Sequence, residues 1–428
     1  PGPPVVQLPH TMDTSLFSHS YQSPTGSPIR ELFPYLSKPG LISFAGGYPS
    51  PELFDGDGLK EAAARVTGGS NDVYQYGPTE GLPALRERLA ELGQKRGVEA
   101  QAQNLLVTTG SQQAFDLLVK TLLDPGDTVL VELPAYPATL QALRLAQVQV
   151  LGVPMDAHGL QTESLRSTLQ ALRTASRPKL LYTVPTFSNP SGTVLCEARR
   201  ASLVELALEY GFFIVEDDPY GELSFTSDLH KPLYRHGMEM AGSRNPVIYL
   251  SSLSKTVAPA LRTGWMAAND DILRRCAIAK QTADLCSSPL TQMIATEYLG
   301  LGRYDAAVER ACRTYQERMQ VMTDGLNALL SHQLSFVQPQ GGMFLWADLH
   351  PDMPLPDLFD ACVREGVLYV PGTAFFPTPT ARKSIRMSFA SPGLADIQEG
   401  VNRLRRAMDA VAPVIRSSRA NASVAAGV

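Results

Sequence analysis

Cysteine, clustered histidine and excess positive charge are all scarce in this sequence, and each shortage argues against a class of protein. The five cysteines are scattered along 428 residues without a CxxC spacing, which argues against a disulfide framework and indicates a reducing, cytoplasmic environment. The histidines show no HxxxH or HExxH spacing, so no metal site is expected. Because the formal net charge is -5, nucleic acid is not expected as a partner.

Long apolar runs and a targeting signal are lacking as well. No stretch of about eighteen apolar residues occurs, so the sequence predicts no membrane-spanning segment. Residues 1–10 lack the basic start and the apolar core of a secretory signal. The sequence begins at Pro1 rather than at Met, which leaves a processed leader open.

Between its ends the chain alternates short apolar strands with helical patterns. Strands are expected at 105–108, 128–132, 179–184, 212–215 and 247–250, and helices at 111–123, 137–145 and 197–210. Near-continuous apolar strands separated by helices indicate an α/β fold, in which helices cover both faces of a mostly parallel sheet. Ligands bind such sheets beyond the carboxyl ends of the strands, and most of the candidate residues follow these ends.

The pattern changes after about residue 290. A long helix at 304–330 leads to strands at 341–346 and 384–389, which indicates a second, smaller α+β layer. We therefore expect a flexible arm rich in Pro, Ser and Thr (1–28), an N-terminal segment of the small domain (29–60), a large ligand-binding domain (61–300), a small C-terminal domain (301–415) and a disordered tail (416–428).

Lys255 lies in the most informative segment, Ser251-Ser252-Leu253-Ser254-Lys255, which Arg262 follows. A lysine amine can form a Schiff base with an aldehyde, and hydroxyls together with a guanidinium are what a phosphate requires. Pyridoxal phosphate (PLP) carries both groups, so this one segment could hold both ends of it. Taken alone, a Ser-rich turn with a solvated lysine is the commoner explanation of such a string.

Three further segments place polar or aromatic residues just past strand ends. Ser111 and Gln112 enter a helix whose free N–H groups and dipole would attract an anion, although Ser111 could equally be an ordinary helix cap. Tyr136 could stack on a flat heteroaromatic ring or could be a core tyrosine. Asn189, in Asn-Pro-Ser-Gly, lies in a turn in either case, and could hydrogen-bond a phenolic oxygen of the cofactor.

Charged groups complete the set. Asp217 follows an apolar strand, where a buried carboxylate needs a cation, and a protonated pyridine nitrogen would supply one. Tyr220 could donate to the phenolate oxygen, and an acidic loop that holds a metal or caps a helix is the weaker alternative. Arg386 is expected within an apolar strand, where it would bind either the α-carboxylate of an amino acid or a structural partner.

Together these segments resemble the class I/II aminotransferases of PLP fold type I. The resemblance rests on N-P-x-G at Asn189, D-x-x-Y at Asp217, S-x-S-K-x-x-x-P-x-x-R ending at Arg262, and Arg386 in a late strand. It extends from about residue 29 to residue 404. It implies a mostly parallel seven-stranded sheet covered by helices, a smaller α+β domain, and a homodimer that shares its active sites.

The resemblance also implies a role for each residue. Lys255 would carry the cofactor, and Asp217 would pair with its pyridine nitrogen. Asn189 and Tyr220 would contact the ring oxygen, while Tyr136 would stack on the ring. The phosphate would be held by Ser111, Gln112, Ser252, Ser254, Arg262 and, from the neighbouring subunit, Tyr76.

The front of the chain is similar to the α-aminoadipate and kynurenine aminotransferases, through Pro28-Ile29-Arg30 and Ile42-Ser-Phe-Ala-Gly-Gly-Tyr-Pro49. In that branch the Ile-Arg segment folds over the substrate. The residues expected to bind the substrate are therefore Arg30, Gly47, Tyr48, Asn189 and Arg386. One departure from the family is Ala260, where Gly commonly follows the proline.

The activity implied is ping-pong transfer of an amino group between an acidic, aromatic or aliphatic amino acid and a 2-oxo acid, commonly 2-oxoglutarate. Two alternatives stay open. Lyases and decarboxylases keep the same lysine and aspartate on the same fold. Aminotransferase-like domains also act as ligand sensors in regulators with a DNA-binding module at the front, although the short stretch before Ile29 and the negative net charge argue against that.

Overall fold

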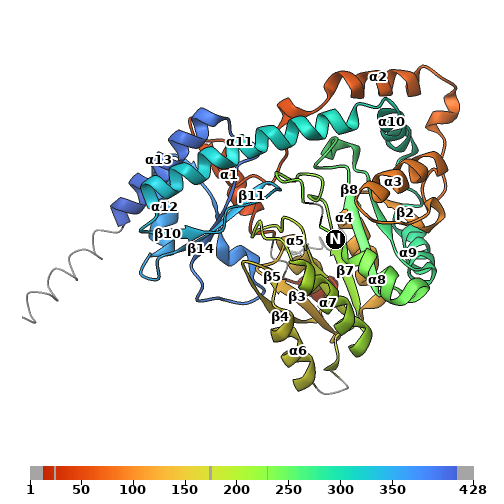
Figure 1. Ribbon diagram of the computed structural model, residues 1–428, viewed down its shortest axis with the longest axis horizontal. Coiled ribbons are helices and arrows are strands. Elements are labelled where there is room, and N and C mark those ends of the chain that lie inside the picture. The colour runs from red at the N-terminus through yellow and green to blue at the C-terminus, as the bar shows by residue number, and fades with distance from the viewer. Residues whose placement is uncertain (1–12, 24–25, 173–175, 229, 412–428) are drawn as a thin grey trace, which may run out of the picture.

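The computed structural model describes residues 13–23, 26–172, 176–228 and 230–411. Two units lie side by side, and the long helix α11 (Tyr304–Leu330) runs from one to the other (Figure 1). Among the helices of these residues, none has both the length and the apolar character that crossing a bilayer demands.

The larger unit is built on an eight-stranded sheet in the order β2-β9-β8-β7-β6-β3-β4-β5. The strands are β2 (Leu105–Thr108), β3 (Thr128–Leu133), β4 (Gln149–Asp156), β5 (Gly159–Leu160), β6 (Leu180–Thr183), β7 (Phe213–Asp217), β8 (Val247–Ser252) and β9 (Gly264–Ala267). The β4-β3-β6-β7-β8 segment is parallel, and β9 runs antiparallel between β8 and β2. The expected mostly parallel sheet is confirmed, with eight strands rather than seven because the two-residue β5 extends its edge.

Helices cover both faces of this sheet, as the apolar strands predict. Val129 and Val131 belong to one core cluster while Leu130, between them on β3, belongs to the other, because successive side chains of a strand point to opposite faces. The helices of this unit are α3 (Pro83–Lys95), α4 (Ser111–Leu122), α5 (Pro137–Leu145), α6 (Thr162–Ala171), α7 (Glu197–Tyr210), α8 (Leu233–Ala241), α9 (Asp270–Ala283) and α10 (Pro289–Gly300), together with α2 (Gly56–Thr67), which packs on α10.

The smaller unit contains an antiparallel sheet in the order β10-β11-β14-β13. Its elements are β10 (Leu334–Phe336), β11 (Phe344–Leu349), α12 (Leu355–Glu365), β13 (Val370–Pro371), β14 (Ser384–Ser388) and α13 (Leu394–Val411). Near the front of the chain, a short helix α1 (Phe33–Leu36) precedes β1 (Ile42–Ser43), which pairs in parallel with β12 (Val367–Leu368). Residues 42–43 are thereby attached to the C-terminal unit.

Part of the expected N-terminal arm is described. Residues 14–16 and 19–21 form two short 3-10 helices, and Ser20 Oγ donates to the carbonyl of Leu145 at 2.7 Å. Residues 1–12 and 24–25 of the arm, and the whole expected tail at 416–428, lie outside the described residues.

Candidate active site

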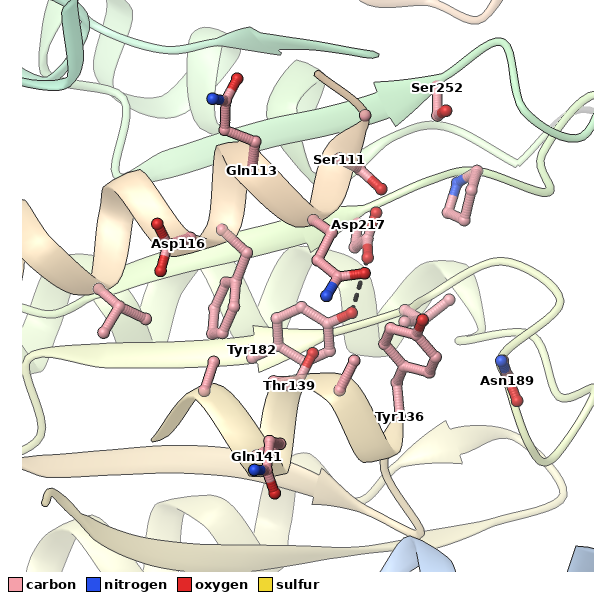
Figure 2. A pocket seen from close by; sticks show the side chains of 18 of the residues that line it. Ser111, Gln113, Asp116, Tyr136, Thr139, Gln141, Tyr182, Asn189, Asp217 and Ser252 are labelled. Atoms are coloured by element: carbon pink, nitrogen blue, oxygen red, sulfur yellow. Dashed lines mark hydrogen bonds between the residues drawn. The ribbon is translucent and has the colours of Figure 1, made fainter. Parts of the chain in front are cut away.

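A cavity of about 960 Å³ opens at the carboxyl ends of β6, β7 and β8, and continues between α4 and α5 (Figure 2). Most of the residues singled out in the sequence line it: Gly47, Tyr48, Ser111, Gln112, Tyr136, Asn189, Asp217, Tyr220, Ser252, Ser254, Lys255, Arg262 and Arg386. The sheet brings them together because β7 and β8 are parallel neighbours whose last residues are Asp217 and Ser252.

Asp217 is held by a tyrosine that the sequence analysis did not single out. The Tyr182 hydroxyl on β6 donates to Asp217 Oδ2 at 2.6 Å, as the dashed line in Figure 2 shows. The other oxygen, Oδ1, is buried without a hydrogen-bond partner among the described residues. Burial raises the pKa of Asp217 to about 7, and Tyr182 opposes that rise by hydrogen-bonding the carboxylate. A cation next to Oδ1 would supply the missing hydrogen-bond partner and would offset the cost of burying the charge.

Lys255 reaches the same cavity from the turn after β8. Its Nζ donates to the carbonyl of Gly47 at 2.9 Å, which connects the lysine to the N-terminal segment. Burial lowers the pKa of Lys255 to about 8, and the positive charges of Arg386 and Arg262 contribute to the shift. A larger fraction of this amine is therefore neutral, and so nucleophilic, near pH 8 than in an ordinary lysine.

The start of α4 has the properties of an anion site. The residue before the helix is Gly110, with φ +80°, and among the described residues no side chain caps the first N–H groups, so Ser111 is not the cap that the sequence also allowed. Arg262 Nη2 donates to the carbonyl of Thr109 at 3.3 Å, and a Cβ on Gly110 would lie 2.5 Å from that nitrogen. A glycine is needed at 110 both for the backbone angle and for this close approach.

Hydroxyl groups stand beside this turn. Ser252 Oγ lies 2.8 Å from Ser254 Oγ, and Arg262 Nη1 lies 3.5 Å from the same Ser254 oxygen. The hydroxyls, the guanidinium and the uncapped helix start together offer the donors that a phosphate requires. The structure therefore groups the expected phosphate ligands Ser111, Gln112, Ser252, Ser254 and Arg262 around one end of the cavity.

Asn189 lies in a loop that two buried charged residues hold in place. Glu132 on β3 accepts from the Val184 N–H at 2.8 Å and from Ser188 Oγ at 3.3 Å. From α7, Arg200 donates to the Pro185 carbonyl at 2.8 Å. Asn189 is thus fixed at the cavity wall, where its Nδ2 lies 3.5 Å from the Tyr220 hydroxyl.

The two aromatic residues expected beside the cofactor ring also lie at the wall. Tyr136 precedes α5 and faces the cavity near Tyr182 and Asn189 (Figure 2). Burial raises the pKa of Tyr136 and of Tyr220, so both phenols stay protonated and can donate a hydrogen bond at neutral pH.

Arg386 is fully buried on β14, and its guanidinium points into the cavity from the C-terminal unit. Nη1 donates to Asn189 Oδ1 at 2.9 Å and Nη2 to the Ala45 carbonyl at 2.7 Å, while Nε has no partner among the described residues. Burial lowers the pKa of Arg386 to about 10; the groups that oppose this shift are the phenols of Tyr220 and Tyr136, and no carboxylate is among them. The structural ion pair that the sequence left open is therefore absent from the described part of the chain.

Two predicted residues do not line the cavity. Tyr76 is 78% exposed. Such exposure is what we expect of a side chain that acts in the active site of a neighbouring subunit. Arg30 is exposed, whereas its neighbour Ile29 lines the cavity. At the far end of the cavity lie Ser20 and Tyr21, which the sequence assigned to a flexible arm.

The residues present fit PLP. Asp217 Oδ1 is an orphaned buried oxygen that a protonated ring nitrogen would satisfy, and the uncapped start of α4 with Arg262 would receive a phosphate. Lys255 supplies an amine with a lowered pKa for the aldehyde.

Comparisons with known proteins agree with this site. The family model described as "Aminotransferase class I and II" matches residues 53–404. The aromatic-amino-acid aminotransferase 1 of Thermococcus litoralis is 36% identical over 91% of this chain and 93% of its own length. The structure of α-aminoadipate aminotransferase from Thermus thermophilus, complexed with N-(5'-phosphopyridoxyl)-L-leucine, has a TM-score of 0.85 and 36% identity and covers 94% of this chain and 99% of that chain. The kynurenine aminotransferase of Pyrococcus horikoshii has a TM-score of 0.87 and 34% identity, over 92% of this chain and 97% of that chain.

These matches confirm PLP as the cofactor and the fold-type-I architecture, and they confirm the predicted branch. They do not favour the lyase or the ligand-sensing alternative.

Proposed function

This chain belongs to the class I and II aminotransferase family and is a PLP-dependent amino-acid transaminase, and from that premise we propose how its residues act and on what. The amino donor is an acidic, aromatic or aliphatic α-amino acid, and the acceptor is a 2-oxo acid, 2-oxoglutarate in the first place. The names of the relatives, which cover aromatic, α-aminoadipate and kynurenine substrates, support this range within amino-acid metabolism.

The observation that carries the proposal is the unpaired charge of Arg386. A buried guanidinium without a carboxylate is costly, and the α-carboxylate of an amino or 2-oxo acid would complete it with a planar, two-point contact. Because both substrates of a transaminase carry that carboxylate, one arginine can position both. Asn189, which already binds Arg386 at 2.9 Å, orients the guanidinium.

When bound, PLP draws electrons from the substrate Cα and so allows its proton to leave. Asp217, in its ionised form, keeps the ring nitrogen protonated, with Tyr182 fixing the carboxylate. With PLP bound, Lys255 would hold the cofactor until the substrate amine took its place, and the freed amine would then move a proton from the substrate Cα to the cofactor. Tyr220 and Asn189 would donate to the ring oxygen and Tyr136 would stack on the ring, while Gly47 and Tyr48 line the part of the cavity that would hold the substrate side chain. Arg30, which is exposed and outside the cavity lining, would have to fold over the substrate.

A homodimer with shared active sites is part of the proposal. The exposed Tyr76 would reach the phosphate of the neighbouring subunit. Mixing Tyr76→Phe with Lys255→Ala subunits tests this, because a hybrid dimer contains one site with both residues intact. Activity above that of either parent supports sharing, and no gain on mixing verified dimers contradicts it.

We also propose that the protein is located in the cytoplasm. The five cysteines are free thiols in the described residues, which is typical of proteins from reducing compartments. Cell fractionation with an antibody against the chain would test it, and recovery of the protein in an oxidising compartment would refute it.

One experiment tests the proposed substrates. The PLP-loaded protein is mixed with single amino acids, and the loss of the lysine-bound cofactor absorbance and the appearance of pyridoxamine phosphate are followed. Amino acids of the proposed classes should convert it, and 2-oxoglutarate should restore the first spectrum. Lyase products without pyridoxamine phosphate would refute transamination.

A further inference from the structure

Lys280 is a fully buried lysine that none of the proposed steps uses. It lies in the last turn of α9, with its side chain 0% exposed, and its Nζ lies 2.7 Å from both carboxylate oxygens of Asp284. Burial lowers the pKa of Lys280, and Asp284 opposes that shift. A buried ion pair is tolerated when further hydrogen bonds satisfy its remaining polar groups, so its other contacts are informative.

Gln113 connects this ion pair to the turn that begins α4. Its Oε1 accepts from Lys280 Nζ at 3.0 Å and from the Thr109 N–H at 2.7 Å. Its Nε2 donates to Asp284 Oδ2 at 2.6 Å. Figure 2 shows Gln113 pointing away from Tyr182 and Asp217, whereas Ser111 of the same helix points toward Asp217.

Thr109 is held through each of its polar groups. Besides the N–H bond to Gln113, its hydroxyl lies 3.1 Å from Ser287 Oγ and 3.4 Å from Asp284 Oδ2. Its carbonyl accepts from Arg262 Nη2 at 3.3 Å. One residue, Thr109, therefore joins the end of α9 to the arginine proposed to bind the phosphate. Since no side chain in the described part of the chain caps α4, the geometry of its start depends on these contacts.

We propose that Lys280 and Asp284 are positioning residues for the cofactor phosphate, acting on Thr109 mainly through Gln113. They do not touch the phosphate. By fixing Thr109 they fix the direction in which the first N–H groups of α4 and the Arg262 guanidinium face the cavity. This inference rests on the phosphate site proposed above. Its physical basis is preorganisation: donors that are already aimed lose no orientational freedom when the anion binds.

A comparison of PLP binding with pyridoxal binding distinguishes a role at the phosphate from a general effect on stability, because pyridoxal lacks the phosphate. Apo protein is titrated with each compound, and the absorbance of the lysine-bound product gives the two dissociation constants. For Lys280→Met we expect the Kd of PLP to rise about tenfold or more, and the Kd of pyridoxal to change by less than about twofold.

A second variant keeps the test independent of folding defects around a buried charge. Gln113→Met retains the Lys280–Asp284 ion pair and its 3.4 Å contact with the Thr109 hydroxyl, but it cuts the connection to the Thr109 N–H, so it should show the same selective loss of PLP affinity. The matched control is Arg275→Met, which removes an exposed ion pair with Asp271 at the same i,i+4 spacing on the same helix. It should leave both affinities unchanged.

Equal losses of PLP and pyridoxal affinity in the two test variants would overturn the inference, as would unchanged PLP affinity with a lowered unfolding temperature of the apo protein. A wild-type protein that binds PLP no better than pyridoxal would instead refute the phosphate site itself. The two failures are thereby distinguishable.

Discussion

Arg386 Nη1 donates to Asn189 Oδ1 at 2.9 Å, and this bond ties β14 of the C-terminal unit to a loop of the large sheet. It leaves Nε of Arg386 without a partner among the described residues, in a side chain that is 1% exposed. The guanidinium is therefore oriented before any substrate binds, and its Nε–H remains available to donate to a substrate.

Arg386→Lys should raise the KM of the amino acid and of the 2-oxo acid alike. An ammonium group keeps the charge but cannot make the two-point contact, and hydrogen bonds to charged groups contribute about 1.5–3 kcal/mol, which corresponds to roughly a tenfold to hundredfold change. Steady-state kinetics with each substrate varied in turn would measure it.

Arg382→Lys is the matched control for that change. Arg382 makes a comparable two-point contact with Asp348, but at the surface, where ion pairs contribute little. Its KM values should stay unchanged. If Arg386→Lys also left both KM values unchanged, another group would have to bind the carboxylate.

Tyr182→Phe should weaken PLP binding about tenfold at neutral pH and shift the pH dependence of binding upward. The Tyr182 hydroxyl lowers the pKa of Asp217 by stabilising its charged form, so its loss raises that pKa above the present value of about 7. A neutral Asp217 cannot pair with the protonated ring, and affinity should recover as the pH rises. Fluorescence titrations of apo protein between pH 6 and 9, a range of about three units around that pKa, would show the shift.

Tyr249→Phe is the control for this prediction. Its hydroxyl donates to Asp218 Oδ2 at 2.8 Å, so the variant removes a buried Tyr–Asp hydrogen bond from the aspartate next to Asp217 in the sequence. Asp218 keeps its hydrogen bond from Arg96. PLP affinity should be retained. An equal loss in both variants would mean that buried tyrosines act through stability and not through Asp217.

The amine of Lys255 should combine with PLP most rapidly above about pH 8. Its pKa is lowered from 10.5 to about 8 by burial and by Arg386 and Arg262, and an amine attacks an aldehyde only in its neutral form. The rate should therefore rise with pH and level off beyond about 8. Stopped-flow absorbance of apo protein mixed with PLP would measure it. Lys255→Ala should show no such phase, and a rate that still climbs through pH 10, about two units higher, would contradict the lowered pKa.

Gly264→Ala should lower PLP affinity without touching a hydrogen-bonding group. A Cβ at 264 would lie 2.6 Å from the backbone of Gly110 and of Ser111, so the start of α4 would have to move. Gly56→Ala, where nothing lies within 4 Å, is the control. We expect the Kd of PLP to rise about tenfold for Gly264→Ala, because strain of about 1–3 kcal/mol would weaken the phosphate site, and to stay unchanged for Gly56→Ala.

Much of the fold is predictable because its signals are local. The helix expected at 197–210 matches α7, whose end is fixed by Gly211 in the left-handed conformation. By contrast, no strand is expected at β9, because its four residues, Gly-Trp-Met-Ala, are too few to show a strand period and begin with a glycine. The strand expected at 341–346 lies at 344–349, after a turn at Gly342 with φ +72°.

The same distinction applies to the site. Lys255, Asp217 and Arg386 were found because their chemistry follows from residue type and motif spacing. Tyr182 was not, because its bond to Asp217 depends on the register of β6 against β7, in which Thr183 pairs with Glu216. Lys280 likewise has the sequence pattern of an ordinary cation near a helix end, and only the packing of α9 against α4 shows that it is buried.

The pairing of β1 with β12 also sets an order of events during synthesis. A ribosome releases residues 42–43 early, but their partner strand at 367–368 emerges only after the entire large sheet has been made. The nascent N-terminal segment therefore stays without this partner while residues 105–267, which form the large sheet, are synthesised. A polypeptide halted before residue 367 would consequently contain Lys255 but neither β12 nor Arg386, and so no group to bind a substrate carboxylate.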